Sequence, residues 1–174
     1  MFRLFATRYY STSATVFETM QNTLRNDLKV AMRNKAPQAE RTMYRSIMSE
    51  LKNLDIDCGP ETTPDEFKIW DHLNKLSKQR RETAAEYLKP GQPERFQELA
   101  EKEIIEAKLI ESYLTKLPVA SKDEITIKVK EIIQKEGISL EDKKQLFKSI
   151  PWGKIQNEWK ASRGMVSDAI NELK

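Results

Sequence analysis

The apolar residues of this chain recur at intervals of three and four positions over most of its length, and this spacing constrains the fold more than any other feature. The first such stripe is Phe17, Met20, Leu24, Leu28 and Ala31. An α-helix turns once every 3.6 residues, so residues with this spacing share one face of a helix. Only 5 of the 174 residues are glycine, whereas Rossmann units and phosphate-binding loops use glycine at special backbone positions. We therefore expect an all-α protein.

Local signals mark where several helices begin and end. The segment Thr63–Glu66 reads Thr-Pro-Asp-Glu, in which the threonine can cap a helix, the proline fits the first helical position and the glutamate completes a capping box. A second capping box, Ser121–Glu124, opens a helix that Gly137 is suited to end. Ser139 is expected to cap a short helix, and a last helix is expected to begin near Ser162.

Pro118 interrupts the helical pattern and predicts a boundary between two parts of the fold. Residues 17–117 are expected to form an N-terminal domain of about four helices, of which the first two make an antiparallel hairpin. Residues 118–174 are expected to form a small C-terminal lobe of three helices. A lobe of this size is marginally stable by itself, because small domains bury a small share of their surface.

The first 16 residues resemble a mitochondrial transit peptide. They contain Arg3, Arg8 and several hydroxylated residues, and no acid precedes Glu18. This composition is typical of segments that mitochondrial import machinery recognises. Arg8 stands two residues before the aromatic Tyr10, and the small residue Ser11 follows Tyr10. This order resembles the pattern that the matrix protease cuts, so we expect cleavage between residues 10 and 11. We expect the mature protein in the mitochondrial matrix; the alternative is an ordinary tail that lacks acids.

No arrangement of residues in the sequence indicates a catalytic or metal site. His72 is the only histidine, and Cys58 is the only cysteine and has acidic Asp57 beside it. A reactive thiol needs positive charge nearby to lower its pKa. Glu-rich residues 101–111 alternate with lysines and lack the Glu-x-x-His pattern of carboxylate-bridged metal sites. We expect no catalytic residue, no metal and no cofactor, and no apolar run is long enough for membrane insertion.

Two clusters of basic residues are candidates for binding nucleic acid, although the net charge is only +3. One lies within residues 75–81, and the other mixes cations with aromatic residues. Cations meet phosphates and aromatic rings stack on bases, so the second pattern suits RNA. The alternative is that both tryptophans pack the small lobe and the lysines only solubilise it. The candidate RNA-binding residues are Lys148, Trp152, Lys154, Trp159, Lys160 and Arg163.

Several segments resemble the YqeY family. They are Leu24–Lys35, Arg45–Asp57, the run from Lys78 to Glu82 with Tyr87, and the acidic helix from Glu103 to Pro118, in which the proline is displaced from its place in the family pattern. The resemblance covers residues 17–174 and is most specific in its first 40 positions. With the predicted transit peptide, the chain resembles a fungal mitochondrial member of this family.

The YqeY family is similar to the tail domain of GatB, a subunit of the tRNA-dependent amidotransferase. The resemblance implies a helical domain followed by a smaller helical lobe, and an association with tRNA or with an amidotransferase assembly. It carries no catalytic set, because the kinase and amidase chemistry belongs to other parts of that enzyme. We therefore interpret the chain as a non-catalytic tRNA- or amidotransferase-binding module. The alternatives are a glutamine-dependent carbon–nitrogen ligase and a protein-interaction adaptor without an RNA role.

Overall fold

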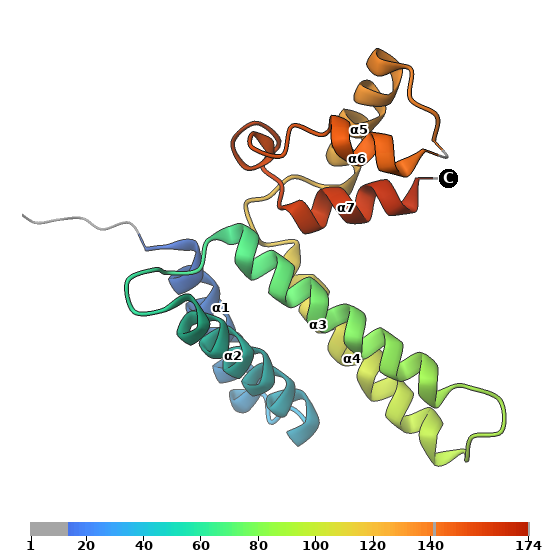
Figure 1. The fold of residues 1–174 in the computed structure, drawn as a ribbon. Coiled ribbons are helices and arrows are strands. Elements are labelled where there is room, and N and C mark those ends of the chain that lie inside the picture. Colours follow the sequence, from blue (N-terminus) through green and yellow to red (C-terminus); the bar gives the residue numbers. More distant parts are fainter. Residues whose placement is uncertain (1–13, 141, 174) are drawn as a thin grey trace, which may run out of the picture.

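The computed structural model describes residues 14–140 and 142–173, and every regular element in this part of the chain is a helix (Figure 1). The predicted all-α class is confirmed. Most of the predicted transit peptide, with its cleavage pattern at Arg8, Tyr10 and Ser11, lies outside the described residues.

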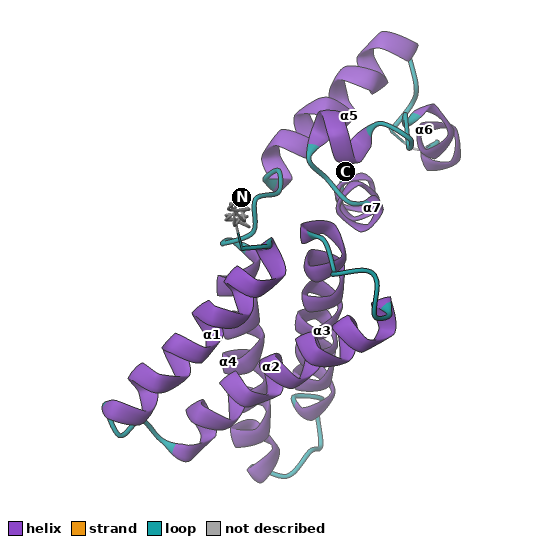
Figure 2. Cartoon of the chain, turned by 90° about the vertical axis from the view of Figure 1, so that its left-hand side faces the viewer, coloured by secondary structure: helices purple, strands orange, loops and turns teal. Residues whose placement is uncertain are grey.

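Helices α1 (Val16–Arg33) and α2 (Gln38–Cys58) form the first hairpin. Thr15 caps α1: its hydroxyl accepts a hydrogen bond from the backbone N–H of Glu18 at 3.2 Å, and the carboxylate of Glu18 accepts one from the N–H of Thr15 at 2.9 Å. This reciprocal pair satisfies two backbone donors that the first turn leaves free. Helices α1 and α2 lie side by side and are joined by a short turn, so the predicted antiparallel hairpin is present (Figures 1 and 2).

Helices α3 (Glu66–Tyr87) and α4 (Arg95–Leu114) form the second hairpin and share the most extensive contact of any two helices. Helix α3 begins in the predicted segment, but the expected cap was wrong, because Asp65 caps the helix in place of Thr63. The carboxylate of Asp65 accepts a backbone N–H at 2.8 Å. A carboxylate is a stronger acceptor than a hydroxyl at the positive end of a helix, and the buried ring of Pro64 stays outside the helix.

The two hairpins pack around a first hydrophobic cluster. Tyr113 is one of its largest buried side chains, and its hydroxyl donates a hydrogen bond of 2.5 Å to Asp27. Burial raises the pKa of Tyr113, and the neighbouring carboxylate raises it further. The cluster consists of Phe17, Met20, Leu24, Ile47, Leu51, Ile69, Leu73, Ile110, Tyr113 and Leu117.

The C-terminal part of the chain forms four shorter elements: α5 (Lys122–Glu136), α6 (Lys143–Ser149), the π-helix η1 (Ile155–Trp159) and α7 (Arg163–Glu172). The predicted capping box of α5 is confirmed, and Gly137 ends that helix in a left-handed conformation with φ of 64°. Glycine adopts this conformation without steric cost, so the sequence signal was reliable.

The expected cap of α6 was wrong. Asp142 caps this helix, because its side chain accepts the backbone N–H of Gln145 at 3.0 Å. Ser139 lies in the preceding turn, where its carbonyl accepts the N–H of Asp142 at 3.0 Å. The short helix therefore starts one turn later than the serine predicts.

A second hydrophobic cluster joins these four elements, and Trp70 from α3 and Val119 pack against both clusters. Figure 2 shows α5, α6 and α7 at one end of the hairpins, beyond the start of α3. The predicted division after residue 117 stays a prediction. The second cluster consists of Ile125, Val129, Ile138, Leu146, Ile150, Ile155, Trp159, Ala161, Met165, Val166, Ala169 and Ile170.

Candidate nucleic-acid interface

The π-helix η1 carries a lysine at each end. Lys154 precedes it, and Lys160 follows it in the left-handed region with φ of 53°. A π-helix is rare and is frequently found at functional sites. A lysine in the left-handed region costs free energy that a glycine would not, so the surrounding structure must hold it there. No element was expected between residues 153 and 161, and this geometry was not foreseen.

The four predicted cations of this region are all exposed. Lys148 lies on α6 and Arg163 is the first residue of α7. Lys154 lies 3.5 Å from the carboxylate of Glu158, in a pair with side chains 68% and 56% exposed, which contributes little to stability. Within the described part of the chain, the other three cations have no carboxylate within 4 Å. Their charges are therefore available to an anionic partner.

The two tryptophans serve the core. Trp159 is only 7% exposed and belongs to the second hydrophobic cluster. The indole N–H of Trp152 donates to the carbonyl of Phe147 at 2.8 Å, and its ring stacks on the ring of Phe147 with centroids 6.0 Å apart. Lys128 lies over the ring of Trp159 at 5.9 Å. This packing follows the alternative that the sequence left open, in which the tryptophans anchor the lobe.

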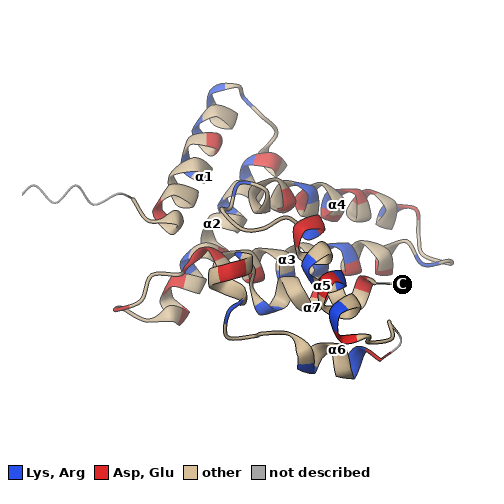
Figure 3. Cartoon of the chain, turned by 90° about the horizontal axis from the view of Figure 1, so that it is seen from above, with Lys and Arg blue, Asp and Glu red and all other residues tan. Residues whose placement is uncertain are grey.

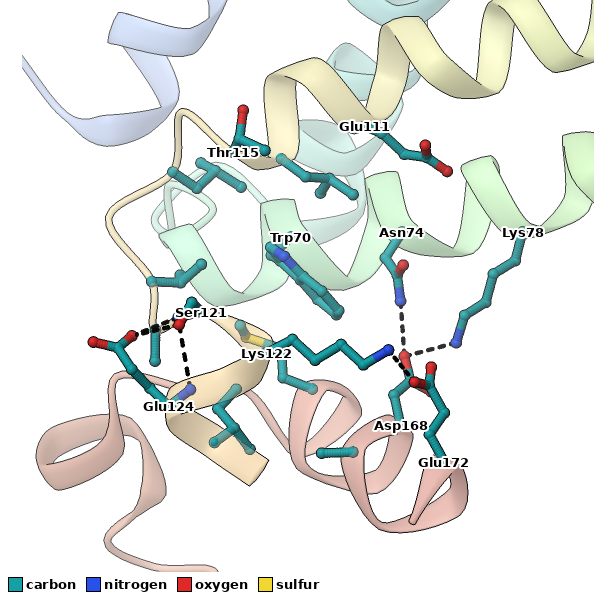
Figure 4. A pocket seen from close by; sticks show the side chains of 17 residues that line it. Trp70, Asn74, Lys78, Glu111, Thr115, Ser121, Lys122, Glu124, Asp168 and Glu172 are labelled. Atoms are coloured by element: carbon teal, nitrogen blue, oxygen red, sulfur yellow. Dashed lines mark hydrogen bonds and ion pairs between the residues drawn. The ribbon is translucent and has the colours of Figure 1, made fainter. Parts of the chain in front are cut away.

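A cleft of about 710 Å³ lies between α3, α4, α5 and α7 (Figure 4). Trp70 projects into it from α3. Asp168 of α7 accepts hydrogen bonds from Asn74 at 3.0 Å and Lys78 at 2.6 Å, and Lys122 forms an ion pair with Glu172. The bonds from Asn74 and Lys78 to Asp168 hold α7 against α3, and the pair of Lys122 and Glu172 ties α5 to α7.

A second polar contact ties α7 to α3. The hydroxyl of Ser162, the cap of α7, donates to Asp71 at 2.6 Å. Burial raises the pKa of Asp71, while the bond from Ser162 opposes that rise. Gly164 leaves room for this approach, because a Cβ at that position would overlap the carboxylate of Asp71. The start of α7, which carries Arg163, is therefore fixed in place by α3.

The other predicted basic cluster, on α3, is largely neutralised by the rest of the fold. Arg80 lies 3.2 Å from both Glu103 and Glu106 of α4. Arg81 makes two hydrogen bonds of 2.7 Å to Glu111, and Lys78 is bound to Asp168 as described above. Figure 3 shows Lys and Arg alternating with Asp and Glu where α3 and α4 run side by side. This cluster stabilises the fold more than it offers free charge.

The remaining polar candidates lie apart from this surface. His72 Nε2 is 3.4 Å from Glu50, and Lys68 donates to the half-buried Cys58 thiol at 3.7 Å. Among the residues that the structure describes, no three His, Cys, Asp or Glu side chains gather as a metal site. Within the same part of the chain, none of the helices combines the length and the apolar character that crossing a membrane requires.

Comparison with known proteins identifies the family. The model of the family described as Yqey-like protein matches residues 21–173. The protein of Komagataella phaffii named altered inheritance of mitochondria protein 41, mitochondrial, is 42% identical over 98% of this chain and 90% of its own length. The protein of the same name in Vanderwaltozyma polyspora is 37% identical over 84% of this chain and 77% of its own length.

The resemblance found in the sequence is thereby confirmed. A third relative with the same name, from Kluyveromyces lactis, is 36% identical over 85% of this chain and 78% of its own length. The family match covers both hairpins and the C-terminal helices, so it includes the cleft and the lysines around η1. The chain therefore belongs to the YqeY-like family, with mitochondrial proteins as its relatives.

Proposed function

We propose that this protein is a tRNA-binding module of the mitochondrial matrix, and that it contacts the phosphate backbone of tRNA through the cations around η1. The observation that carries the proposal is the free, exposed group of Lys148, Lys160 and Arg163 together with Lys154. The similarity of the YqeY family to the GatB tail supports tRNA as the partner and an amidotransferase as the setting.

The distribution of charge supports this surface. Residues 118–174 contain 11 Lys and Arg against 9 Asp and Glu, whereas residues 17–117 contain 17 against 18. The C-terminal part is therefore net positive by 2 and the rest net negative by 1. Phosphate contacts dominate the affinity of proteins for nucleic acid, so a positive end is favoured to face tRNA.

The fold gives these cations a rigid base. The buried Trp159 anchors η1 between Lys154 and Lys160. The Asp71–Ser162 bond fixes the start of α7 beside Arg163. Contacts to phosphate position a protein without reading base sequence, so the proposed module binds different tRNAs with similar affinity.

A salt titration tests the proposal. The full chain is titrated with a tRNA(Gln) transcript, and the wild type is compared with a variant carrying Lys154→Glu, Lys160→Glu and Arg163→Glu. We expect the variant to bind about tenfold more weakly at ~50 mM salt, and its salt slope to fall by about three, because each lost phosphate contact removes about one unit.

A matched control separates this surface from net charge. Lys89→Glu, Lys102→Glu and Lys108→Glu change the total charge equally at exposed positions on the second hairpin. The control variant should bind tRNA like the wild type. Equal losses for both variants, or no binding by the wild type at low salt, would contradict the proposal.

The proposal assigns binding and no chemical step to this chain. Purified protein with ATP, glutamine and misacylated tRNA is therefore expected to form no amidated product. Product formation that depends on all three components would favour the carbon–nitrogen ligase.

Location is tested separately, since N-terminal sequencing of protein from isolated matrix should find a chain that begins at Ser11.

A further inference from the structure

The turn between α1 and α2 carries a second concentration of positive charge. Residues 28–49 contain one acid, Glu40, and five cations. The cations are Lys29, Arg33, Lys35, Arg41 and Arg45, which we call the α1–α2 tip cluster. Figures 1 and 2 both show this turn at the end of the first hairpin that points away from α5, α6 and α7.

The tip cluster is not neutralised by the fold. In the described residues, none of its members has a carboxylate within 4 Å. Four of the five are exposed, and Arg41 is half-buried with its Nε lacking a hydrogen-bond partner among the described residues. The contrast with Arg80 and Arg81 shows that the same chain does pair its arginines elsewhere.

The backbone at the tip holds a lysine where helices ordinarily place glycine. The N–H of Lys35 donates to the carbonyl of Met32 at 3.2 Å, and the N–H of Ala36 donates to that of Ala31 at 2.9 Å. These two bonds form a Schellman motif, in which the left-handed position is usually glycine. Here it is Lys35, with φ of 53°.

Lys35 and Lys160 both adopt the left-handed backbone conformation. In the described part of the chain, they are the two non-glycine residues with positive φ. One lies in the tip cluster and the other beside η1. A backbone conformation of this kind persists where the surrounding structure over-determines it, and such positions cluster at binding sites.

The tip lacks an apolar face that would insert into a lipid surface. The apolar side of α1 is buried in the first hydrophobic cluster. Val30 and Met32 are 52% and 49% exposed. Residues that stand two positions apart on a helix are separated by about 200° around its axis, so these two side chains project in opposite directions. Positive charge without an adjoining apolar stripe suits a phosphate backbone better than a membrane.

We propose that the α1–α2 tip cluster is a second phosphate-binding surface, which contacts the tRNA held by the C-terminal helices. This inference rests on the proposed function. The two cationic surfaces lie at opposite ends of the molecule, and the α1 helix alone is about 27 Å long at 1.5 Å per residue. An extended polyanion such as tRNA spans this distance, so both surfaces bind one molecule.

The test uses the full chain and the tRNA(Gln) transcript. A tip variant with Lys29→Glu, Arg33→Glu and Lys35→Glu is compared with the wild type and with the control at Lys89, Lys102 and Lys108. We expect the tip variant to bind about tenfold more weakly at ~50 mM salt, with a salt slope lower by about three. The control should stay within about twofold of the wild type.

A single substitution separates binding from folding. Lys35→Gly removes one charge and relieves the left-handed strain, so it should raise the melting temperature by about 2–4 °C. The same variant should bind tRNA about two- to threefold more weakly and lose about one unit of salt slope. A gain of stability with unchanged affinity overturns the role assigned to Lys35. This variant also keeps the test decisive if the triple tip variant fails to fold.

The outcomes distinguish this inference from the proposed function. If the wild type binds tRNA and only the C-terminal reversal weakens binding, the tip proposal is overturned and the proposed function stands. If the wild type binds no tRNA, both are overturned. If the tip variant loses binding to phosphatidylcholine–phosphatidylserine vesicles while its tRNA affinity is unchanged, the partner is an anionic membrane and the tip proposal is overturned.

Discussion

The arginines of α3 are paired with acids, whereas the cations around η1 are largely free, although both groups stood out in the sequence as basic clusters. Arg80 lies 3.2 Å from Glu103 and from Glu106, and Arg81 is bound to Glu111 by two bonds of 2.7 Å. Around η1, Lys160 and Arg163 have no such partner among the described residues. A basic cluster is thus a binding candidate only after the acids that the fold brings to it have been counted.

Substitutions in the two regions should have different consequences, a loss of stability in one and a loss of affinity in the other. Removing a paired cation leaves half-buried carboxylates without compensation, so it should cost stability. Removing a free, exposed cation leaves nothing unpaired, so it should cost affinity for an anionic partner and little stability. Variants in the two regions should therefore give opposite phenotypes.

The largest expected effect lies beneath the free cations. Trp159→Ala should lower the free energy of unfolding by about 3–5 kcal/mol, because a buried aromatic side chain leaves a cavity when truncated. Urea unfolding followed by circular dichroism measures this loss, and Trp159→Phe should show a smaller one. A variant that melts like the wild type and loses tRNA affinity would instead make Trp159 a stacking platform.

Arg80→Met should have the next largest effect. It retains much of the apolar stem and leaves Glu103 and Glu106, with side chains 20% and 15% exposed, without their shared cation. We expect a loss of about 1–3 kcal/mol in urea unfolding. The tRNA affinity of the folded variant should be unchanged, and a selective loss of affinity would break the contrast between the two regions.

Acid should weaken the pair of Arg81 and Glu111. The hydrogen bonds from Arg81, helped by Ser77, lower the pKa of Glu111 below its ordinary value of 4.5. Its stabilisation is therefore complete above that value and disappears as the pH falls through the lower pKa of the folded state. Both side chains are more than a third exposed, so the loss should be at most about 1 kcal/mol. The free energy of unfolding of Arg81→Met, measured in urea at several pH values, should lack this loss at acid pH.

The smallest effect on stability should come from the free cations themselves. Lys154→Gln, Lys160→Gln and Arg163→Gln together should change the free energy of unfolding by no more than about 0.5 kcal/mol, because exposed charges contribute little. Arg163 stands at the positive end of α7, so its removal does not weaken that helix. A loss comparable to that of Arg80→Met would show that these residues are structural.

Features set by neighbouring residues were predictable from the sequence. The capping box of α5 and the left-handed Gly137 depend on residues within one turn, and both were foreseen. The choice of Asp65 over Thr63 was not, because both residues can cap a helix and the sequence does not show which of them lies next to the free N–H groups of α3. The all-α class followed from periodicity, which tertiary contacts reinforce.

The candidate surface was predictable only in part. The sequence named the four cations around η1, but it could not show that Trp159 is buried or that η1 is a π-helix. It also could not show that Arg80 meets acids more than twenty residues away, because α4 turns back along α3. The five cations of the tip cluster are visible in the sequence, but only the fold shows that no carboxylate of the described residues lies within 4 Å of them and that Lys35 adopts the left-handed conformation.

Hydrogen–deuterium exchange of the full chain, with and without tRNA at low salt, tests the central claim most directly. We predict slower amide exchange on binding in residues 154–163, with unchanged exchange in the part of α3 and α4 where Arg80 and Arg81 are paired. Protection confined to α3 and α4, or no protection at residues 154–163 under conditions in which tRNA is bound, would contradict the account.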